Sequence, residues 1–485
     1  MPDKEAQVID AVPKGVLIGG EWHDGDGSLA VDDPSTGKVL TEIASAGEAE
    51  AIAALDAATA AQAGWAATPP RERAEILRRA FALMIERKDD LALLMTLEMG
   101  KPVAESATEV AYAAEFFRWF SEEACRIDGG YLVNPAGGTR IVVLRQPVGP
   151  SLMITPWNFP AAMGTRKLGP AIAAGCTAIV KPAKQTPLSM LALASILIEA
   201  GLPKGVLSVL PAAKASVISE TLMADTRLRK LSFTGSTEVG RSLLGLAAGN
   251  VLRTSMELGG NAPFLVFDDA DLDAAVEGAM VAKMRNIGEA CTSANRFIVH
   301  ESVAEAFAEA LAARMGALKL GRGTEPDAQV GPLIDRDAQE RVAGLVADAV
   351  ERGAIVLTGG SARPGEGSFF EPTVVTGVPR DARMMSEEIF GPVAGIATFA
   401  DDDEAIAAAN DTIYGLVAYA YVRDLNRALK VAERLESGMV GLNVGVVSTP
   451  AAPFGGVKQS GLGREGGFVG IDEYLETKYV AVATP

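Results

Sequence analysis

Short apolar, strand-like runs alternate with helical segments through most of this chain, and this alternation constrains its fold more than any other feature. The first series of strand-like runs lies at residues 151–155, 178–181, 206–210 and 231–233. A second series lies at residues 262–266, 296–299, 355–358 and 417–422. Strands that alternate with helices form a parallel sheet covered by helices on both faces. The sequence therefore predicts an α/β protein, and its 485 residues suffice for two such domains in tandem with a cleft between them.

Helical and β-rich segments flank this alternation. Short strands and turns are expected at the N-terminus, followed by helices at 49–63, 71–88, 91–97 and 104–124. A β-rich run at 139–145, before a turn at 147–150, predicts a hairpin that extends from the body, and a second β-rich run lies at 474–482. Because an unpaired ribbon favours association, both runs are candidates for a subunit interface. A Gly- and Pro-rich stretch at 361–368 predicts a surface loop.

The composition argues against several functional classes. A net charge of −18 disfavours binding to nucleic acid or to an anionic membrane surface. The three cysteines, Cys125, Cys176 and Cys291, have no paired spacing, which favours a reducing compartment over a disulfide scaffold or a structural zinc site. Only two histidines occur, too few for a metal cluster. Residues 1–10 contain no apolar signal segment, and no apolar run reaches the ~20 residues of a membrane span, so a soluble cytoplasmic protein is predicted.

Three polar residues are candidates for chemistry on a carbonyl group. Cys291 lies among small and polar residues whereas Cys176 lies in an apolar run, so Cys291 is the candidate reactive thiol. Glu257 precedes a Gly-Gly pair, where a carboxylate is either a general base or a turn-capping group. Asn158 follows a strand, where its amide either donates to an oxyanion or braces the turn. A thiol, a carboxylate and an amide donor are the groups that form and hydrolyse a thioester.

Two segments are candidates for nucleotide binding. Residues 233–240 follow a strand and open a helix, where glycine lets the backbone approach a diphosphate at the helix N-terminus. Their spacing is not GxGxxG, so a turn that simply needs small residues is an equal alternative. Lys181 and Lys184 end another strand, at the sheet edge where open α/β folds collect ligands. Exposed lysines are more often solvated than functional, and the residues alone leave this choice open.

In this order and spacing, the motifs resemble the aldehyde dehydrogenase superfamily almost from end to end. Matching segments lie at 155–160, 256–260, 387–392 and 453–461. The resemblance implies a Rossmann-like cofactor-binding domain, a catalytic domain and a small β arm for oligomerisation. The implied boundaries are 1–127 and 147–257 for the cofactor-binding domain, 258–447 for the catalytic domain, 128–146 and 468–485 for the arm, and 448–467 for a return to the cofactor-binding domain.

The same resemblance assigns roles to individual residues. It makes Cys291 the nucleophile, Glu257 the general base and Asn158 the oxyanion donor, in a reaction that requires no metal. The positions that match cofactor contacts are Trp157, Lys181, Lys184, Gly235, Ser236, Leu258, Glu388 and Phe390. The expected partners are a small-molecule aldehyde and further copies of the chain, in a homodimer or a homotetramer.

Within the superfamily, the chain most resembles the succinate-semialdehyde dehydrogenases. Arg166, Arg285 and Ser448 match the positions that bind the substrate carboxylate in that group. A guanidinium suits a carboxylate because two N–H groups match two oxygens. Ion pairs of these arginines within the fold are the alternative. Glutarate semialdehyde or a sulfonated aldehyde would fit the same residues, and a cofactor-independent thiol esterase is the alternative from another class.

Three positions depart from the family pattern. Lys184 replaces a glutamate that holds the adenosine ribose in many members, and a lysine there favours the 2′-phosphate of NADP. The segment 211–218 lacks the usual glycines, and Ile218 is expected to crowd the cofactor. Either NADP or NAD is therefore expected, with NADP slightly favoured. Ser293 stands where some relatives carry a second cysteine, so no local disulfide switch at Cys291 is expected.

Overall fold

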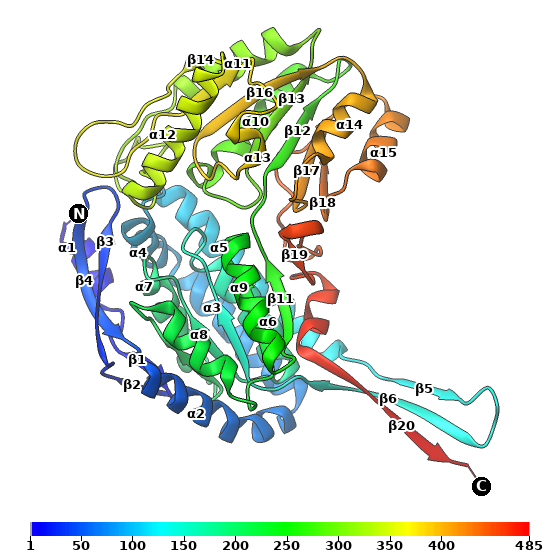
Figure 1. Cartoon of the computed structure of the whole chain (residues 1–485). Helices are drawn as coiled ribbons and strands as arrows, with labels where there is room; N and C mark the ends of the chain where they lie inside the picture. The colour runs from blue at the N-terminus through cyan, green and yellow to red at the C-terminus, as the bar shows by residue number, and fades with distance from the viewer. Residues whose placement is uncertain (1, 485) are drawn as a thin grey trace.

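The larger of the two main sheets has eight strands, of which five run parallel in its centre (Figure 1). In this computed structural model, which describes residues 2–484, three antiparallel strands complete the sheet at its edges. Across the sheet the strands are β19 (Gly461–Leu462), β11 (Arg253–Glu257), β10 (Lys230–Thr234), β7 (Ser151–Ile154), β8 (Ala178–Lys181), β9 (Leu207–Val209), β1 (Val16–Ile18) and β2 (Glu21–His23). Strands β7 and β8 are buried throughout, which explains why they are short, largely apolar runs in the sequence, whereas the equally buried β10 also contains Lys230 and Ser232.

Helices cover both faces of this sheet. The helices on one face are α3 (Pro70–Glu86), α4 (Lys88–Met99), α5 (Val103–Glu123), α6 (Ala162–Ala174) and α7 (Pro187–Glu199), with the short η1 (Ala124–Arg126) after α5. Those on the other face are α2 (Glu48–Ala67), α8 (Ala215–Ala224) and α9 (Thr237–Gly249). Every residue of α6 is buried, because α3 and α5 pack against it.

The second main sheet has seven strands, all parallel except β14 at one edge. Its order is β14 (Ile355–Thr358), β15 (Thr373–Thr376), β16 (Val393–Phe399), β13 (Ala294–His300), β12 (Ala262–Val266), β17 (Val417–Tyr421) and β18 (Met439–Leu442). Its helices are α10 (Leu272–Met284), α11 (Ala304–Gly316), α12 (Arg336–Glu351), α13 (Arg383–Ser386), α14 (Asp402–Asn410) and α15 (Leu425–Arg434). Alternate residues of β12 enter opposite cores, since Phe264 packs with α10 and α11 and Leu265 with α14 and α15.

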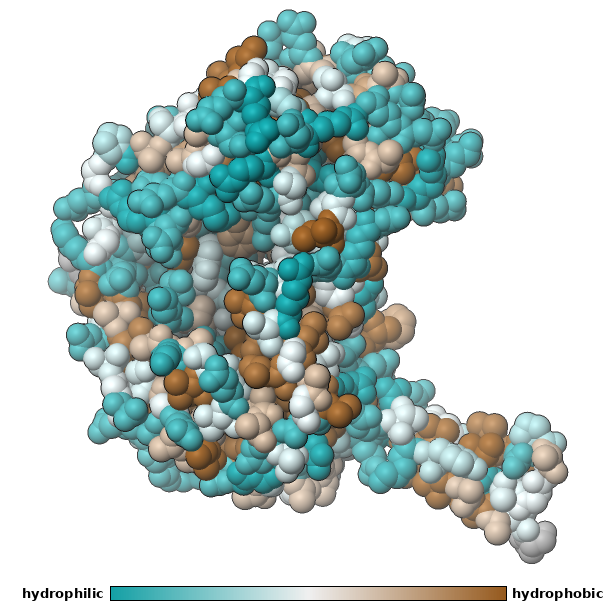
Figure 2. All heavy atoms as spheres, in the orientation of Figure 1, coloured by the Kyte–Doolittle hydropathy of each residue, from teal (hydrophilic) through white to brown (hydrophobic). Residues whose placement is uncertain are grey.

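A three-stranded antiparallel sheet projects from the body as an arm (Figure 1). Its strands are β5 (Gly130–Val133), β6 (Thr139–Pro147) and β20 (Leu475–Ala483), and β20 pairs with β6 along its whole length. The segment between β19 and β20 contains η4 (Phe468–Tyr474), and η3 (Lys458–Ser460) precedes β19. Apolar side chains gather on the arm surface (Figure 2), and the exposed ones are Tyr131, Leu132, Val133, Leu144, Tyr479 and Val482.

Most elements form where the sequence predicts them. Residues of the N-terminus form a helix, α1 (Pro2–Asp10), ahead of the expected short strands, and a small hairpin follows in β3 (Gly27–Asp33) and β4 (Lys38–Ser45). Strands β11, β15, β16 and β18 were not predicted. The strands of the eight-stranded sheet lie in the segments expected to form the cofactor-binding domain, and those of the seven-stranded sheet lie in the segment expected to form the catalytic domain. The exact domain boundaries stay a prediction. None of the helices within residues 2–484 has the length and apolarity needed to cross a membrane.

Candidate active site

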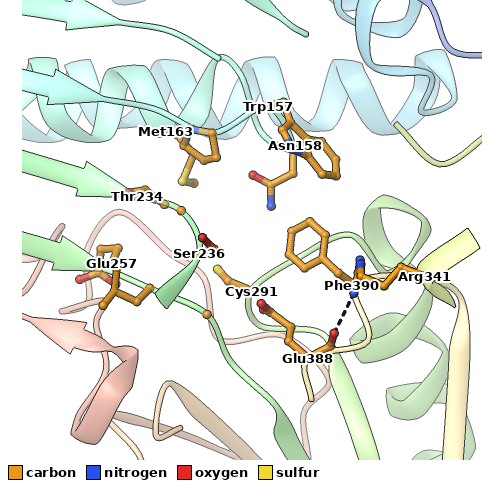
Figure 3. Close-up of a pocket in the computed structure, with 14 residues that line it drawn as sticks. Trp157, Asn158, Met163, Thr234, Ser236, Glu257, Cys291, Arg341, Glu388 and Phe390 are labelled. Carbon is orange, nitrogen blue, oxygen red and sulfur yellow. Dashed lines mark hydrogen bonds between the residues drawn. The ribbon is translucent and has the colours of Figure 1, made fainter. Parts of the chain in front are cut away.

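A cavity of about 370 Å³ lies at the carboxyl ends of β7, β10 and β11, where loops of the second sheet close over them (Figure 3). This is the edge at which open α/β sheets bind ligands. The predicted residues that line the cavity are Trp157, Asn158, Gly235, Ser236, Glu257, Leu258, Cys291, Glu388 and Phe390. The predicted residues that lie outside its lining are Lys181, Lys184, Arg166, Arg285 and Ser448.

Cys291 follows a tight loop with three consecutive left-handed residues. Asn286, Ile287 and Gly288 have φ angles of 55°, 62° and 77°, a conformation that is costly for any residue with a side chain. The backbone N–H of Asn286 donates to a carboxylate oxygen of Glu105 at 2.8 Å, which ties the loop to α5. The loop therefore holds Cys291 in a position that the surrounding structure fixes.

The Cys291 thiol faces the cavity (Figure 3). Burial raises its pKa to about 12, and the positive charge of Arg166 opposes this shift. The carboxyl groups of Glu388 and Glu257 raise the pKa further, while Arg285 again opposes them. The two arginines thus favour the thiolate form of Cys291, whereas burial and the acidic groups disfavour it.

The Asn158 side chain points into the cavity beside Cys291 (Figure 3). Its Nδ2 donates to the backbone carbonyl of Glu289 at 3.0 Å, and its Oδ1 accepts the N–H of Phe159 at 3.1 Å. The Asn286 side chain donates to the same Glu289 carbonyl at 2.9 Å. These bonds fix the plane of the Asn158 amide and leave its second N–H free for another acceptor. Asn158 thus braces the turn and can also serve as an oxyanion donor.

Glu257 is a buried carboxyl group at the end of β11, and one of its oxygens has no partner among the described residues. Its pKa is raised well above the usual range by burial and by the nearby Glu465. Lys167 acts in the opposite direction on this pKa, and its Nζ donates to Glu465 at 2.6 Å and to Ser232 at 2.9 Å. Figure 3 shows the Glu257 side chain turned away from Cys291, so the base role requires the side chain to turn toward the thioester.

Glu388 and Phe390 belong to the loop that closes the cavity from the second sheet. Burial raises the pKa of Glu388 to about 7, and one of its oxygens accepts the N–H of Gly260 at 3.0 Å. Phe390 has a φ of 51° and meets Trp157 edge-to-face, with ring centroids 5.4 Å apart. Arg341 donates to the Glu388 carbonyl at 2.9 Å (Figure 3), which fixes this loop against α12.

The groups near the start of α9 fit an anionic dinucleotide. Ser236 is the N-cap of α9, where its Oγ accepts the N–H of Val239 at 3.4 Å, and the buried Thr234 hydroxyl has no partner among residues 2–484. Lys181 is buried at the end of β8, and burial lowers its pKa to about 8, with Lys184 adding to the shift. A capped helix N-terminus, an orphan hydroxyl and two neighbouring lysines suit phosphate groups.

Ile218 belongs to an apolar core beside the larger sheet. Its side chain is fully buried in the core formed by α2, α8 and α9, and it does not line the cavity. The Ile218 side chain therefore packs into this core, and its effect on the adenosine end of a cofactor stays a prediction. Ser293 is likewise buried, and its hydroxyl donates to the Lys283 carbonyl at 3.4 Å.

Arg166, Arg285 and Ser448 lie together on another side of Cys291. Arg285 donates to the Ser448 hydroxyl at 3.4 Å, and both side chains are half-buried. Arg166 is only 2% exposed and lies 3.8 Å from a carboxylate oxygen of Glu465. Its Nη2 donates to the Tyr112 hydroxyl at 2.6 Å. The structure therefore brings the three predicted residues near one another, but it encloses Arg166 and leaves Arg285 accessible.

Sequence reasoning missed several residues of this site. Lys167, Glu465, Tyr112 and Arg341 reach it from segments far apart in the chain, and no local motif marks them. The Lys167–Glu465 pair joins residues 298 positions apart. One signal was available for Lys167, because it lies in a mostly apolar segment, where a buried lysine must find a partner.

The fold and the cavity together are those of an α/β enzyme that places a thiol, a buried carboxyl group and an amide at the carboxyl edge of its larger sheet. The model of the aldehyde dehydrogenase family matches residues 22–480, and the chain belongs to this family. The resemblance seen in the sequence motifs and the prediction of an NAD(P)-dependent aldehyde dehydrogenase are thereby confirmed.

Similar proteins cover nearly the whole chain. Succinate-semialdehyde dehydrogenase of Paenarthrobacter nicotinovorans is 60% identical over 447 residues, which are 92% of this chain and 99% of that protein. Glutarate-semialdehyde dehydrogenase of Pseudomonas putida is 52% identical over 468 residues, or 96% of this chain and 97% of that protein. The crystal structure of an NADP-dependent enzyme of Escherichia coli superimposes with a TM-score of 0.97 at 49% identity, covering 98% of this chain and 99% of that one.

Proposed function

We propose that this aldehyde dehydrogenase oxidises a semialdehyde with a distal carboxylate, that succinate semialdehyde is the preferred substrate, and that NADP is the preferred cofactor. The observation that carries the proposal is the Arg285 guanidinium. It makes no ion pair with a carboxylate in the part of the chain that the structure describes, and it lies 4.9 Å from the Phe159 ring centre and donates to Ser448. A half-buried cation that makes no ion pair, beside a hydroxyl and close to the thiol, suits an anionic substrate group.

The reaction follows from the groups around the cavity. Cys291 gives up its thiol proton to solvent, and the resulting thiolate attacks the aldehyde carbon. A C–S bond forms, and the carbonyl π electrons move to oxygen. Asn158 donates its free N–H to this oxyanion, together with the backbone N–H of Cys291. A nicotinamide held beside Ser236, Glu388 and Phe390 would supply the acceptor for the hydride that this carbon loses, and the carbon stays bonded to Cys291 as a thioester. Glu257 then takes a proton from water, the water attacks the thioester, and the acid leaves as the thiolate is restored.

The cofactor preference rests on Lys181 and Lys184. Neither lysine makes an ion pair within residues 2–484, and Lys184 is exposed where a ligand could reach it. A 2′-phosphate would supply the missing negative charge, whereas the ribose hydroxyls of NAD would not. The similarity to an NADP-dependent enzyme supports the same preference.

Glutarate semialdehyde, which is one methylene longer than succinate semialdehyde, is the alternative substrate. The 52% identity to a glutarate-semialdehyde dehydrogenase favours this candidate over others. A sulfonated aldehyde would satisfy the same cation. An esterase that uses no cofactor is the alternative from another class, and the capped helix and lysine pair, which ester hydrolysis does not need, argue against it as the main activity.

We further propose that the arm assembles the protein into a homodimer or homotetramer. Its two outer strands, β5 and β20, leave unpaired edges, and exposed apolar side chains lie on both (Figure 2). A free ribbon with such a surface associates readily.

A turnover assay tests the substrate and cofactor together. The three aldehydes are succinate semialdehyde, glutarate semialdehyde and uncharged butanal, and each is assayed in the presence of NADP, in the presence of NAD and without nucleotide. Turnover is followed by the absorbance of the reduced cofactor and by the amount of acid released. We expect kcat/KM to favour the acidic aldehydes over butanal by about 10-fold or more, the size of a hydrogen bond to a charged group. Equal values for butanal would remove the proposed anion site. Hydrolysis of an added ester without nucleotide, together with no oxidation of any aldehyde, would favour the esterase.

The variant Arg285→Ala tests whether this arginine causes the preference for acidic aldehydes. It should raise KM for succinate semialdehyde by about 10- to 100-fold while leaving butanal nearly unchanged. Arg314→Ala removes an exposed arginine that pairs with Glu277, and it serves as the matched control. A similar loss for both aldehydes in Arg285→Ala would mean that the arginine supports the fold and not the substrate.

A further inference from the structure

The Tyr112 side chain lies between the two arginines of the anion site. Its hydroxyl accepts a hydrogen bond from Arg166 Nη2 at 2.6 Å. The centre of its ring lies 5.9 Å from the guanidinium carbon of Arg166 and 5.8 Å from that of Arg285. Arg285 in turn donates to Ser448 at 3.4 Å. One aromatic side chain from α5 therefore joins both cations.

Arg166 is covered on several sides. Its guanidinium lies 4.0 Å from the ring centre of Phe454 and 5.3 Å from that of Phe116, and Glu465 lies 3.8 Å away. By contrast, Tyr112 is only half-buried, as are Arg285 and Ser448. The accessible polar groups of the anion site are thus a guanidinium and two hydroxyls, with the Arg166 charge lying behind one of the hydroxyls.

The hydrogen-bonding capacity of the Tyr112 hydroxyl is only partly used. It accepts from Arg166, and its own O–H has no acceptor within residues 2–484. A hydroxyl that accepts from a cation becomes a stronger donor, because the two bonds polarise each other. This O–H would therefore form its strongest hydrogen bond with an acceptor that carries negative charge.

We propose that Tyr112 donates its O–H to the distal carboxylate of the substrate and completes the anion site with Arg285 and Ser448. This inference rests on the proposed function, since it names a further residue that selects acidic aldehydes. Arg166 then acts as a positioning residue, which orients the Tyr112 hydroxyl and supplies positive charge behind it. No carboxylate of the protein accepts from this hydroxyl in the described part of the chain, which leaves the place free for the substrate.

A purely structural role for Tyr112 makes a different prediction. Its ring packs edge-to-face against Phe116, with centroids 5.1 Å apart. The variant Tyr112→Phe keeps this packing and removes the hydroxyl alone. If only the packing matters, this variant should behave as the unchanged enzyme does on every aldehyde.

The test compares kcat and KM of the unchanged enzyme and Tyr112→Phe, with NADP, on succinate semialdehyde and butanal. We expect KM for succinate semialdehyde to rise about 10-fold or more, with little change in kcat and less than a twofold change for butanal. Inhibition by succinate, a second readout of anion binding without turnover, should weaken by a similar factor. Tyr131→Phe, which removes a hydroxyl from the exposed arm, is the matched control and should change neither value.

The two proposals fail in different ways. If the unchanged enzyme itself does not prefer succinate semialdehyde to butanal, the proposed function is overturned. If that preference is present and Tyr112→Phe retains it in full, with unchanged succinate inhibition, the role of Tyr112 is overturned. Should Tyr112→Phe fail to fold, Arg166→Lys is tested instead, because it keeps the positive charge and loses the Nη2 donor that orients the Tyr112 hydroxyl. Weaker succinate inhibition in this variant would support the role of Tyr112. Inhibition equal to that of the unchanged enzyme would overturn it.

Discussion

Individual side chains in the cavity have acid–base properties that their surroundings set, and Glu257 shows this most clearly. Burial and the charge of Glu465 raise its pKa well above the usual carboxyl range, and Lys167 moderates the shift. The unpaired oxygen of Glu257 is available to accept a proton from water. A raised pKa keeps the group protonated to a higher pH than an ordinary glutamate, so its activity as a base appears only as the pH rises through that raised value.

This gives a prediction for Glu257→Gln. The first turnover should still produce a burst of reduced nicotinamide, because thioester formation does not need this carboxyl group. The steady-state rate should fall by about 100-fold or more, since water is no longer activated. In the unchanged enzyme that rate should decline as the pH falls through the raised pKa, and in the variant this limb should disappear. Stopped-flow absorbance over a pH series measures both phases.

Glu277→Gln, which alters an exposed carboxylate, is the control for this experiment. It should retain the burst, the steady-state rate and the pH limb. A steady-state rate in Glu257→Gln that matches the unchanged enzyme, with the same pH profile, would assign the base to another group.

At the scale of elements, the loop between α10 and β13 determines where the nucleophile lies. Its left-handed residues bring Gly288 against the loop that carries Glu388 and Phe390. A Cβ atom on Gly288 would lie 2.2 Å from the Gly391 carbonyl oxygen, and the φ of 77° already disfavours any side chain. The nucleophile loop and the cofactor loop can therefore meet only because this residue is glycine.

We expect Gly288→Ala to separate these two loops. Thermal and denaturant unfolding should show a loss of more than about 2 kcal/mol in the free energy of unfolding, from combined strain and collision. kcat should fall as well, because Cys291 moves relative to the nicotinamide site.

Gly344→Ala in α12 is the matched control for this glycine. No atom lies within 4 Å of the position of its Cβ, so the change should be neutral or stabilise the helix by about 0.5–1 kcal/mol. Retained stability and activity in Gly288→Ala would show that the two loops do not depend on this close approach.

For the molecule as a whole, the arm is the feature that a single copy of the chain does not explain. It projects away from both main sheets, and β6 is its central strand, with β20 from the C-terminus on one side and β5 on the other (Figure 1). Tyr131 on β5 is 67% exposed and Tyr479 on β20 is 59% exposed. Large apolar surfaces on a free ribbon are typical of a subunit interface.

The double variant Tyr131→Ser with Tyr479→Ser should therefore shift the protein toward smaller assemblies. Light scattering coupled to size-exclusion chromatography would measure the mass across a concentration series. Val39→Ser, which changes a side chain that is 58% exposed on β4, should leave the mass unchanged. An unchanged mass in the double variant, or a monomeric unmodified protein, would remove the arm as the main interface.

Much of the fold and part of the site follow from local sequence. Fully buried strands such as β7 and β8 must be short apolar runs, and their alternation with helices identifies an α/β fold without any knowledge of contacts. Cys291 differed from Cys176 in its small, polar neighbours, and in the structure Cys291 faces the cavity whereas Cys176 lies in the core. The family resemblance placed 128–146 and 468–485 in one arm, but the register of β20 with β6 was not predictable, because the pairing of a strand is set by the path of the whole chain.

The sequence by itself determined the class of fold, the family and the set of residues expected to do the chemistry, because these depend on periodicity and on motifs within short segments. Only the tertiary structure decided how those residues are used. It enclosed Arg166 behind Tyr112, left Arg285 accessible, and placed Lys167 and Glu465 beside Glu257. These relations join groups that are far apart along the chain, and the burial that sets their charges exists only once the chain has folded around them.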